Sequence, residues 1–204
     1  MSLFEKHQEL LERAIQANYE RTFFAAYPEH PSPSVYGETA DKDGQNAFKK
    51  QLNSKFEGLL QKGEDGWKGA EVSPYLNDKL NIQYPFFSSD KLVSNATDAF
   101  HVWRKVSVEQ RAGILIEALD RVRARFFELA YATMHTTGQG YMMAFQASGP
   151  HANDRALEAI SMGFEEQKRF PNNAIWDKPM GKYNITLDKE WVTVPKGVSL
   201  AIGC

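Results

Sequence analysis

The sequence has only one cysteine, Cys204, among 204 residues. No disulfide can form within the chain, which fits a reducing compartment such as the cytoplasm. It also lacks any apolar run close to the roughly 20 residues that a membrane-spanning helix needs. The first residues, from Met1 to Lys6, have no basic segment followed by an apolar stretch, so they do not form a secretory signal. We therefore expect a cytoplasmic protein.

Positive charge is not in excess either. The chain carries 24 basic and 26 acidic residues, for a formal net charge of -2. Partners such as nucleic acid and anionic membranes favour a basic face, so we expect neither. With 42% hydrophobic and 12% aromatic residues, the chain can bury a core and is not a disordered tail.

Metal-ligand spacing is absent from the sequence. None of the histidines forms the i, i+4 pair of a helical zinc site, and no cysteine lies beside one: His7, His30, His101, His135 and His151. We therefore predict no metal site. His135 lies near a predicted helix end, where a positive charge is mildly favoured, and this is a sufficient reason for its position.

Two further motifs do not indicate the functional sites that their residue types suggest. Cys204 ends an apolar run with no His, Lys or Arg among the seven residues before it, so nothing local lowers its thiol pKa. We expect a small buried hydrophobe there and not a nucleophile. Gly138-Gln139-Gly140 follows a helical pattern and has no third glycine, so it reads as a helix end and not as a dinucleotide fingerprint.

Helical periodicity dominates the first 170 residues. A capping box at Ser2 and Glu5 opens a helix expected over 3–26, and a second helix is expected over 44–60. Residues 61–89 combine glycine, proline and aromatics, which predicts an irregular loop packed on a core.

The middle of the chain predicts four further helices. A short apolar stripe covers 96–103, a capping box begins at Ser107, and a third helix ends at Gly138. The fourth spans 141–170 with a break near Gly149-Pro150. Four aromatic residues at helical spacing are expected in the core: Trp103, Phe126, Phe127 and Tyr131.

The pattern changes to strands near the end. Residues 183–187 and 191–194 read as two strands joined by a turn at 188–190, and 197–204 reads as a strand buried on both faces. Such a strand needs further chain packed over it. This predicts that the 204 residues are the front part of a larger protein, with much of its chemistry beyond Cys204.

From Trp103 onward the sequence resembles the NAD(P)-dependent aldehyde dehydrogenase superfamily. The motifs that carry the resemblance are Trp103, then Ser107, Glu109, Gln110 and Arg111, then Ile114-Leu115, Leu129-Ala130, Thr137-Gly138-Gln139, and Val194-Pro195-Lys196-Gly197-Val198. Gln139 stands where the family usually has Lys. The ending Thr136-Thr137-Gly138-Gln139, the long N-terminal extension and Cys204 in place of a proline are similar to the subgroup of phenylacetic acid degradation (PaaN) proteins.

The resemblance implies an α/β aldehyde dehydrogenase-like fold whose N-terminal portion is mostly α-helical, with a β-hairpin and the first strand of the dinucleotide-binding sheet. It divides the chain into a helical extension over 1–60, the helical part of the family's N-terminal region over 61–180, a hairpin of the oligomerisation type over 181–196, and the strand over 197–204. The hairpin implies a homo-oligomer, a dimer or a dimer of dimers.

In this family a cysteine thiolate attacks a small-molecule aldehyde, hydride passes to NAD or NADP, and a glutamate-activated water releases the acid. The resemblance places all the catalytic groups after Cys204, so none is assigned here and the chain alone is expected to be inactive. The residues expected beside the cofactor are Ile202, Gly203 and Cys204. The implied substrate is a CoA-linked semialdehyde from phenylacetate ring cleavage.

Two alternatives stay open. The chain could be a stand-alone, non-catalytic helical interaction protein related to such enzymes. Its apolar C-terminal strand would then be covered within the protein, and the protein would be monodisperse in solution. The full-length protein could also be an acylating relative that transfers its acyl group to CoA. The sequence does not decide between NAD and NADP.

Overall fold

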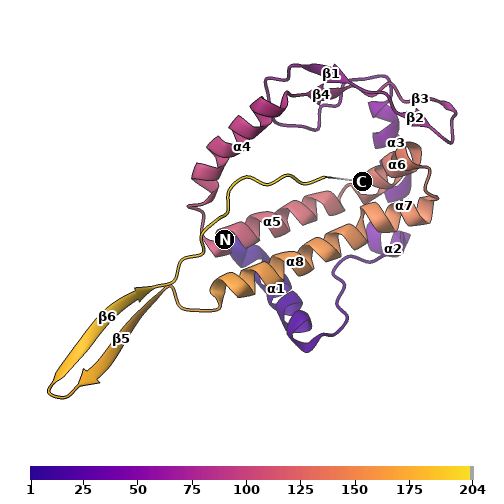
Figure 1. Ribbon diagram of the computed structural model, residues 1–204. Coiled ribbons are helices and arrows are strands. Elements are labelled where there is room, and N and C mark those ends of the chain that lie inside the picture. The colour runs from indigo at the N-terminus through magenta and orange to yellow at the C-terminus, as the bar shows by residue number, and fades with distance from the viewer. Residues whose placement is uncertain (203–204) are drawn as a thin grey trace.

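The computed structural model describes residues 1–202 (Figure 1). Within this range the chain forms eight helices and six strands, four of which are only two or three residues long. The helices are α1 Leu3–Glu20, α2 Pro33–Tyr36, α3 Ala40–Gln51, α4 Ser89–Trp103, α5 Val108–Arg123, α6 Phe126–Thr137, α7 Tyr141–Ser148 and α8 Pro150–Lys168. The strands are β1 Gly66–Lys68, β2 Val72–Ser73, β3 Asp78–Lys79, β4 Tyr84–Phe86, β5 Asn173–Met180 and β6 Tyr183–Glu190.

Local signals in the sequence set several helix ends. Both predicted capping boxes form: the Ser2 hydroxyl accepts from Glu5 N at 3.2 Å, and the Ser107 hydroxyl accepts from Gln110 N at 3.1 Å. Gly138 ends α6 with a φ of 81°, a conformation that glycine adopts without a Cβ penalty. The predicted break near Gly149-Pro150 separates α7 from α8.

Tertiary contacts shorten the first helix. It ends at Glu20, where Arg21 takes a left-handed φ of 58°, and not at residue 26 as predicted. Beyond this point the chain turns toward α8. The backbone N–H of Ala26 donates to the Asp154 carboxylate at 2.8 Å, and Tyr27 is buried in the core.

The second predicted helix, over 44–60, begins earlier and ends sooner, as α3. After α3 the backbone pairs with residues 80–83 and does not continue as helix: Asn53 N donates to Leu80 O at 3.1 Å and Phe56 N to Gln83 O at 2.8 Å. The stretch 61–89, expected as a loop, contains four very short strands in two antiparallel pairs, β1 with β4 and β2 with β3. Pairing between distant residues leaves little periodic signal in strands of two or three residues.

The main hydrophobic core lies where α1 crosses α5 and α8, with α6 and α7 packed on the same cluster (Figure 1). Its buried members come from both halves of the chain: Leu11, Ala14, Tyr27, Ala112, Ile116, Phe126, Phe127, Ala130, Phe145 and Leu157. A smaller cluster of Phe48, Leu80 and Ile82 joins α3 to the strand region. The first 60 residues and the helices after residue 107 therefore share one packed unit.

The prediction that Trp103 belongs to the core is wrong. Its exposed fraction is 39%, and none of the residues of α4 is buried. In Figure 1, α4 arches away from α5 and α8 toward the β1–β4 pair. Helical spacing marked its apolar stripe correctly, but periodicity does not show whether a partner covers the stripe.

Strands β5 and β6 form an antiparallel hairpin that projects from the helices (Figure 1). The predicted strand over 183–187 lies in β6, but its partner is β5 and not residues 191–194. The predicted turn at 188–190 is part of β6, and the actual turn is Gly181-Lys182, with Gly181 at a φ of 62°. Strand β5 was not predicted because it contains Pro179, although an edge strand tolerates proline.

The chain after the hairpin is extended and exposed. Trp191 N donates to Asn172 O at 2.8 Å and the Trp191 ring packs on Phe170, which closes the hairpin base. Residues 197–202, predicted as part of a buried strand, have no strand partner within residues 1–202. A strand is assigned through hydrogen bonds to a neighbour, and none is present among the described residues. None of the described helices combines the length and apolar content required to cross a membrane.

Candidate functional site

The residues predicted to lie beside a cofactor are at the end of the exposed tail. Ile202 is 85% exposed, and Leu200 is similarly exposed. Gly203 and Cys204 lie outside the described residues, so their predicted placement stays a prediction. Within residues 1–202 the side chains of this tail form no hydrogen bond or ion pair.

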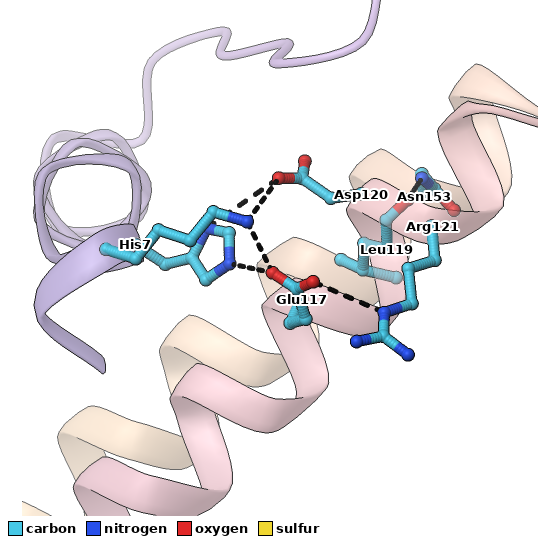
Figure 2. Close-up of polar contacts among 7 residues, drawn as sticks. His7, Glu117, Leu119, Asp120, Arg121 and Asn153 are labelled. Carbon is cyan, nitrogen blue, oxygen red and sulfur yellow. Dashed lines mark hydrogen bonds and ion pairs between the residues drawn. The ribbon is translucent and has the colours of Figure 1, made fainter. Parts of the chain in front are cut away.

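A polar cluster that the sequence analysis missed lies between α1 and α5 (Figure 2). The imidazole of His7, which is only 5% exposed, contacts the Glu117 carboxylate, with 2.9 Å between Nε2 and Oε2. His7 Nδ1 lies 3.9 Å from Asp120 Oδ2 on the next turn of α5. These residues are 110 positions apart in the sequence, so no local spacing could have indicated their contact.

Two cations complete the cluster. Lys6 Nζ lies 2.6 Å from Glu117 Oε2 and 4.0 Å from Asp120 Oδ2, and Arg121 Nε lies 3.2 Å from Glu117 Oε1. Hydrogen bonds from Lys6, then His7, then Arg121 lower the pKa of Glu117 to about 2. Glu117 is therefore ionised throughout the physiological range.

The cluster has the residue types of a metal site. His7, Glu117 and Asp120 each offer one ligand atom, and these atoms lie within 4.8 Å of one another. However, the Lys6 ammonium already occupies the position between the two carboxylates where a divalent cation would sit. The charges balance without a metal, so we assign the cluster to the docking of α1 on α5.

Asn153 adds a buried polar contact between α8 and α5 in the same region (Figure 2). Its side-chain amide donates to Leu119 O at 2.8 Å. The neighbouring Asp154 is also buried, and desolvation raises the pKa of its carboxyl group, while hydrogen bonds from the backbone of Ala26 and Tyr27 act in the opposite direction. Both residues use their polar atoms to fix helices and the chain after α1.

A second polar group links the strand region to α6. Ser73 of β2 is fully buried, and its Oγ lies 2.7 Å from Nδ1 of His135. The imidazole stacks on Phe48 of α3, with 4.9 Å between ring centroids and 11° between planes. Burial lowers the pKa of His135. Ser73 is too enclosed to meet a substrate as a nucleophile.

An open cavity of about 490 Å³ lies between α2–α3 and α5–α6. Its walls are mixed, with Tyr36 and Phe127 beside Arg123 and three carboxylates, Asp43, Asp120 and Glu128. No thiol or imidazole lines it. The cavity therefore lacks the thiolate nucleophile of the chemistry that the sequence resemblance implies.

Comparison with known proteins places this arrangement in context. The profile described as "Aldehyde dehydrogenase family" matches residues 87–203. The chain is also similar to a solved structure described as the crystal structure of NAD-dependent aldehyde dehydrogenase from Burkholderia multivorans, with 43% identity and a TM-score of 0.87. That match covers 93% of this chain, so it extends well before residue 87, but only 34% of the solved chain. None of the curated proteins matches.

Proposed function

Because the chain belongs to the aldehyde dehydrogenase family, we propose that it is the N-terminal part of an NAD(P)-dependent enzyme that oxidises an aldehyde to an acid. The similarity in sequence and fold to the NAD-dependent enzyme, 43% identity at a TM-score of 0.87, carries the proposal. The chain spans about a third of that solved chain, with 34% covered. In our proposal the catalytic cysteine, glutamate and asparagine all follow Cys204, so the 204 residues alone are inactive.

The described residues do not by themselves fit a dinucleotide. In open α/β folds a dinucleotide binds outside the carboxyl ends of parallel strands, next to a helix N-terminus. The three strand pairs within residues 1–202 are antiparallel and two-stranded, and the parallel pairing of Lys55 with Gln83 is an isolated bridge. We therefore propose that Ile202, Gly203 and Cys204 approach NAD or NADP only when further strands pair with this segment.

We further propose a CoA-linked semialdehyde from phenylacetate ring cleavage as the substrate. This finer proposal depends on the subgroup features of the sequence, namely the helix end Thr136-Thr137-Gly138-Gln139 and the cysteine at position 204. Helix α6 ends within this motif, and Gly138 has the left-handed conformation that favours glycine.

We propose that the β5–β6 hairpin joins copies of the protein into a dimer or a dimer of dimers. All sixteen residues of the two strands are exposed, and both outer edges of the hairpin lack strand partners within the described chain. Unpaired backbone groups at such an edge can extend the sheet of another subunit. Several exposed side chains on the hairpin are large and apolar: Ile175, Trp176, Met180, Tyr183, Ile185 and Leu187.

The decisive experiment uses the protein produced from its native gene. We expect an intact mass well above 23.1 kDa and aldehyde-dependent formation of NADH or NADPH, fastest with the CoA-linked semialdehyde. The matched control is the 204-residue chain, which should give no turnover and no NAD or NADP binding by calorimetry.

Three outcomes would contradict the proposal. A native mass near 23.1 kDa would make dehydrogenase activity untenable and would favour the non-catalytic interaction protein. Tight binding of NAD or NADP to the 204-residue chain would show that the cofactor site does not depend on later residues. A requirement for free CoA during turnover would identify the acylating type of enzyme and overturn the hydrolytic outcome proposed here.

A further inference from the structure

The neighbouring backbone groups fix the direction of the hydrogen bond between Ser73 and His135. The Ser73 hydroxyl oxygen accepts two backbone N–H groups, from Tyr75 at 3.2 Å and from Leu76 at 3.1 Å. A hydroxyl has two acceptor lone pairs and one proton. With both lone pairs engaged, the proton of Ser73 points to Nδ1 of His135, which lies 2.7 Å away.

This geometry fixes the state of the imidazole. Nδ1 must be unprotonated to accept from Ser73, so the neutral ring carries its proton on Nε2. A proton added at Nδ1 would point at the hydroxyl proton of Ser73. The Ser73 oxygen could accept a hydrogen bond from Nδ1 only by losing the hydrogen bond from Tyr75 N or from Leu76 N. Because Ser73 is fully buried, no water replaces the lost partner.

The surroundings of the ring oppose a positive charge. It stacks on Phe48 from α3 and meets the Tyr75 ring edge-on, with 5.9 Å between centroids. Tyr75 is the titratable group among these neighbours, and no carboxylate of the described chain forms an ion pair with His135. The position of His135 in the last turn of α6 favours a cation. Burial outweighs this effect, since the pKa of His135 lies below its ordinary value of 6.5.

The turn after Ser73 also holds the end of α6. The Tyr75 hydroxyl lies 2.8 Å from Gln139 O and 3.2 Å from Gly138 O, and Pro74 lies against Gly138. The same few residues therefore connect the hydrogen bond of His135 to the α6–α7 turn. Loss of the hydrogen bonds of Ser73 would therefore free the backbone of the turn that positions Tyr75.

We propose that protonation of His135 breaks its hydrogen bond with Ser73 and opens the β2–β3 turn, releasing Tyr75 from the α6–α7 turn. The Ser73–His135 contact is thus an acid-sensitive connection between the segment before residue 87 and the helices that follow. It is intact while His135 is neutral and weakens as the pH falls below the ordinary histidine pKa. It is independent of the dehydrogenase reaction and of residues beyond Cys204.

The test combines hydrogen exchange with two variants. In the wild-type chain, the amides of Tyr75 and Leu76, corrected for intrinsic rates, should exchange faster at about pH 5 than at about pH 7.5, by up to about tenfold for each pH unit below the pKa. His135→Asn keeps an acceptor near the position of Nδ1 but cannot titrate, so it should remove the acid response. The control His151→Asn, at an exposed histidine paired with Glu29, should keep it.

A measurement on the His135 ring of the wild-type chain tests the proposal without relying on a variant that must fold. Nitrogen-resolved NMR of wild-type His135 should show the Nε2–H tautomer at neutral pH and a titration below 6.5. The Nδ1–H tautomer, or a titration at or above the ordinary value, would overturn the proposal. An unchanged acid response at Tyr75 and Leu76 in His135→Asn would overturn it as well.

Discussion

Gly44 of α3 lies directly against Phe127 of α6. A Cβ atom placed on Gly44 would come within 2.7 Å of the Phe127 carbonyl carbon and 2.8 Å of Glu128 N. Both obstacles are backbone atoms of a helix, which cannot move aside as a flexible side chain can. The absence of a side chain at residue 44 thus sets how closely α3 approaches α6.

Gly44→Ala should therefore destabilise the chain. Alanine favours a helix over glycine by up to about 1 kcal/mol, but overpacking at a backbone contact costs about 1–3 kcal/mol. We expect a net loss of free energy of unfolding, measured by urea denaturation. The matched control is Gly163→Ala in α8, where nothing lies within 4 Å of the added Cβ. It should be neutral or stabilising, and equal effects of the two variants would contradict the close contact.

Glu117→Gln should change the acid stability of the chain. The pKa of Glu117 is lowered to about 2 in the folded state from an ordinary 4.5. Its contribution is therefore present above about pH 4.5 and lost as the pH falls toward 2. Thermal unfolding across this window should show a shallower loss of stability for Glu117→Gln than for wild type. Glu166→Gln, at an exposed carboxylate paired with Arg169, should follow wild type.

Asp41→Asn should lower the pKa of Tyr131. Burial first, and then the hydrogen bond to Asp41 at 3.0 Å, raise the pKa of this phenol to about 12. Tyr141 donates to the same carboxylate oxygen. Stability from a raised phenol pKa is present below pH 10 and lost as the pH rises through 12.

The ultraviolet absorbance of tyrosinate, followed during an alkaline titration, measures the Tyr131 effect. The tyrosinate signal should appear at lower pH in Asp41→Asn than in wild type. Asp43→Asn is the matched control on the same turn of α3, and it should leave the titration unchanged. No shift in Asp41→Asn would show that burial alone sets the phenol pKa.

Tyr27→Phe should cost little. The hydroxyl of Tyr27 is buried and has no hydrogen bond of good geometry within residues 1–202, although Asn153 lies close to it. Removing an unpaired buried hydroxyl is neutral or stabilising, whereas removing a paired one costs about 0.5–1.5 kcal/mol. Tyr36→Phe provides the paired case, since Tyr36 donates to Pro28 O. Chemical denaturation should rank Tyr27→Phe as the more stable variant, and the reverse order would show that the Tyr27 hydroxyl has a partner.

The sequence predicted features that depend on neighbouring residues. Capping boxes at Ser2 and Ser107 and the glycine end at Gly138 involve contacts within four residues, so their patterns are visible in one window. The burial of Phe126 and Phe127 was also predicted, because their helix has an apolar face.

Features that depend on distant contacts were not predicted. The His7–Glu117 contact joins residues 110 positions apart, and Ser73 meets His135 across 62 positions. The partner strand β5 has no alternating burial, since both its faces are exposed, and Pro179 obscures it further. The cofactor prediction at Ile202 stays untested, because no other strand of the described chain is present to position it.

The shared core has a consequence for how the gene can be divided. Leu11, Ala14 and Tyr27 pack with Ala112, Ile116 and Phe126 in one cluster, although the family profile begins at residue 87. A shortened gene that starts at the profile boundary would leave α5 and α8 without the helix that covers them. We expect its product to enter inclusion bodies, so the first 86 residues are an integral part of the fold and not a detachable leader.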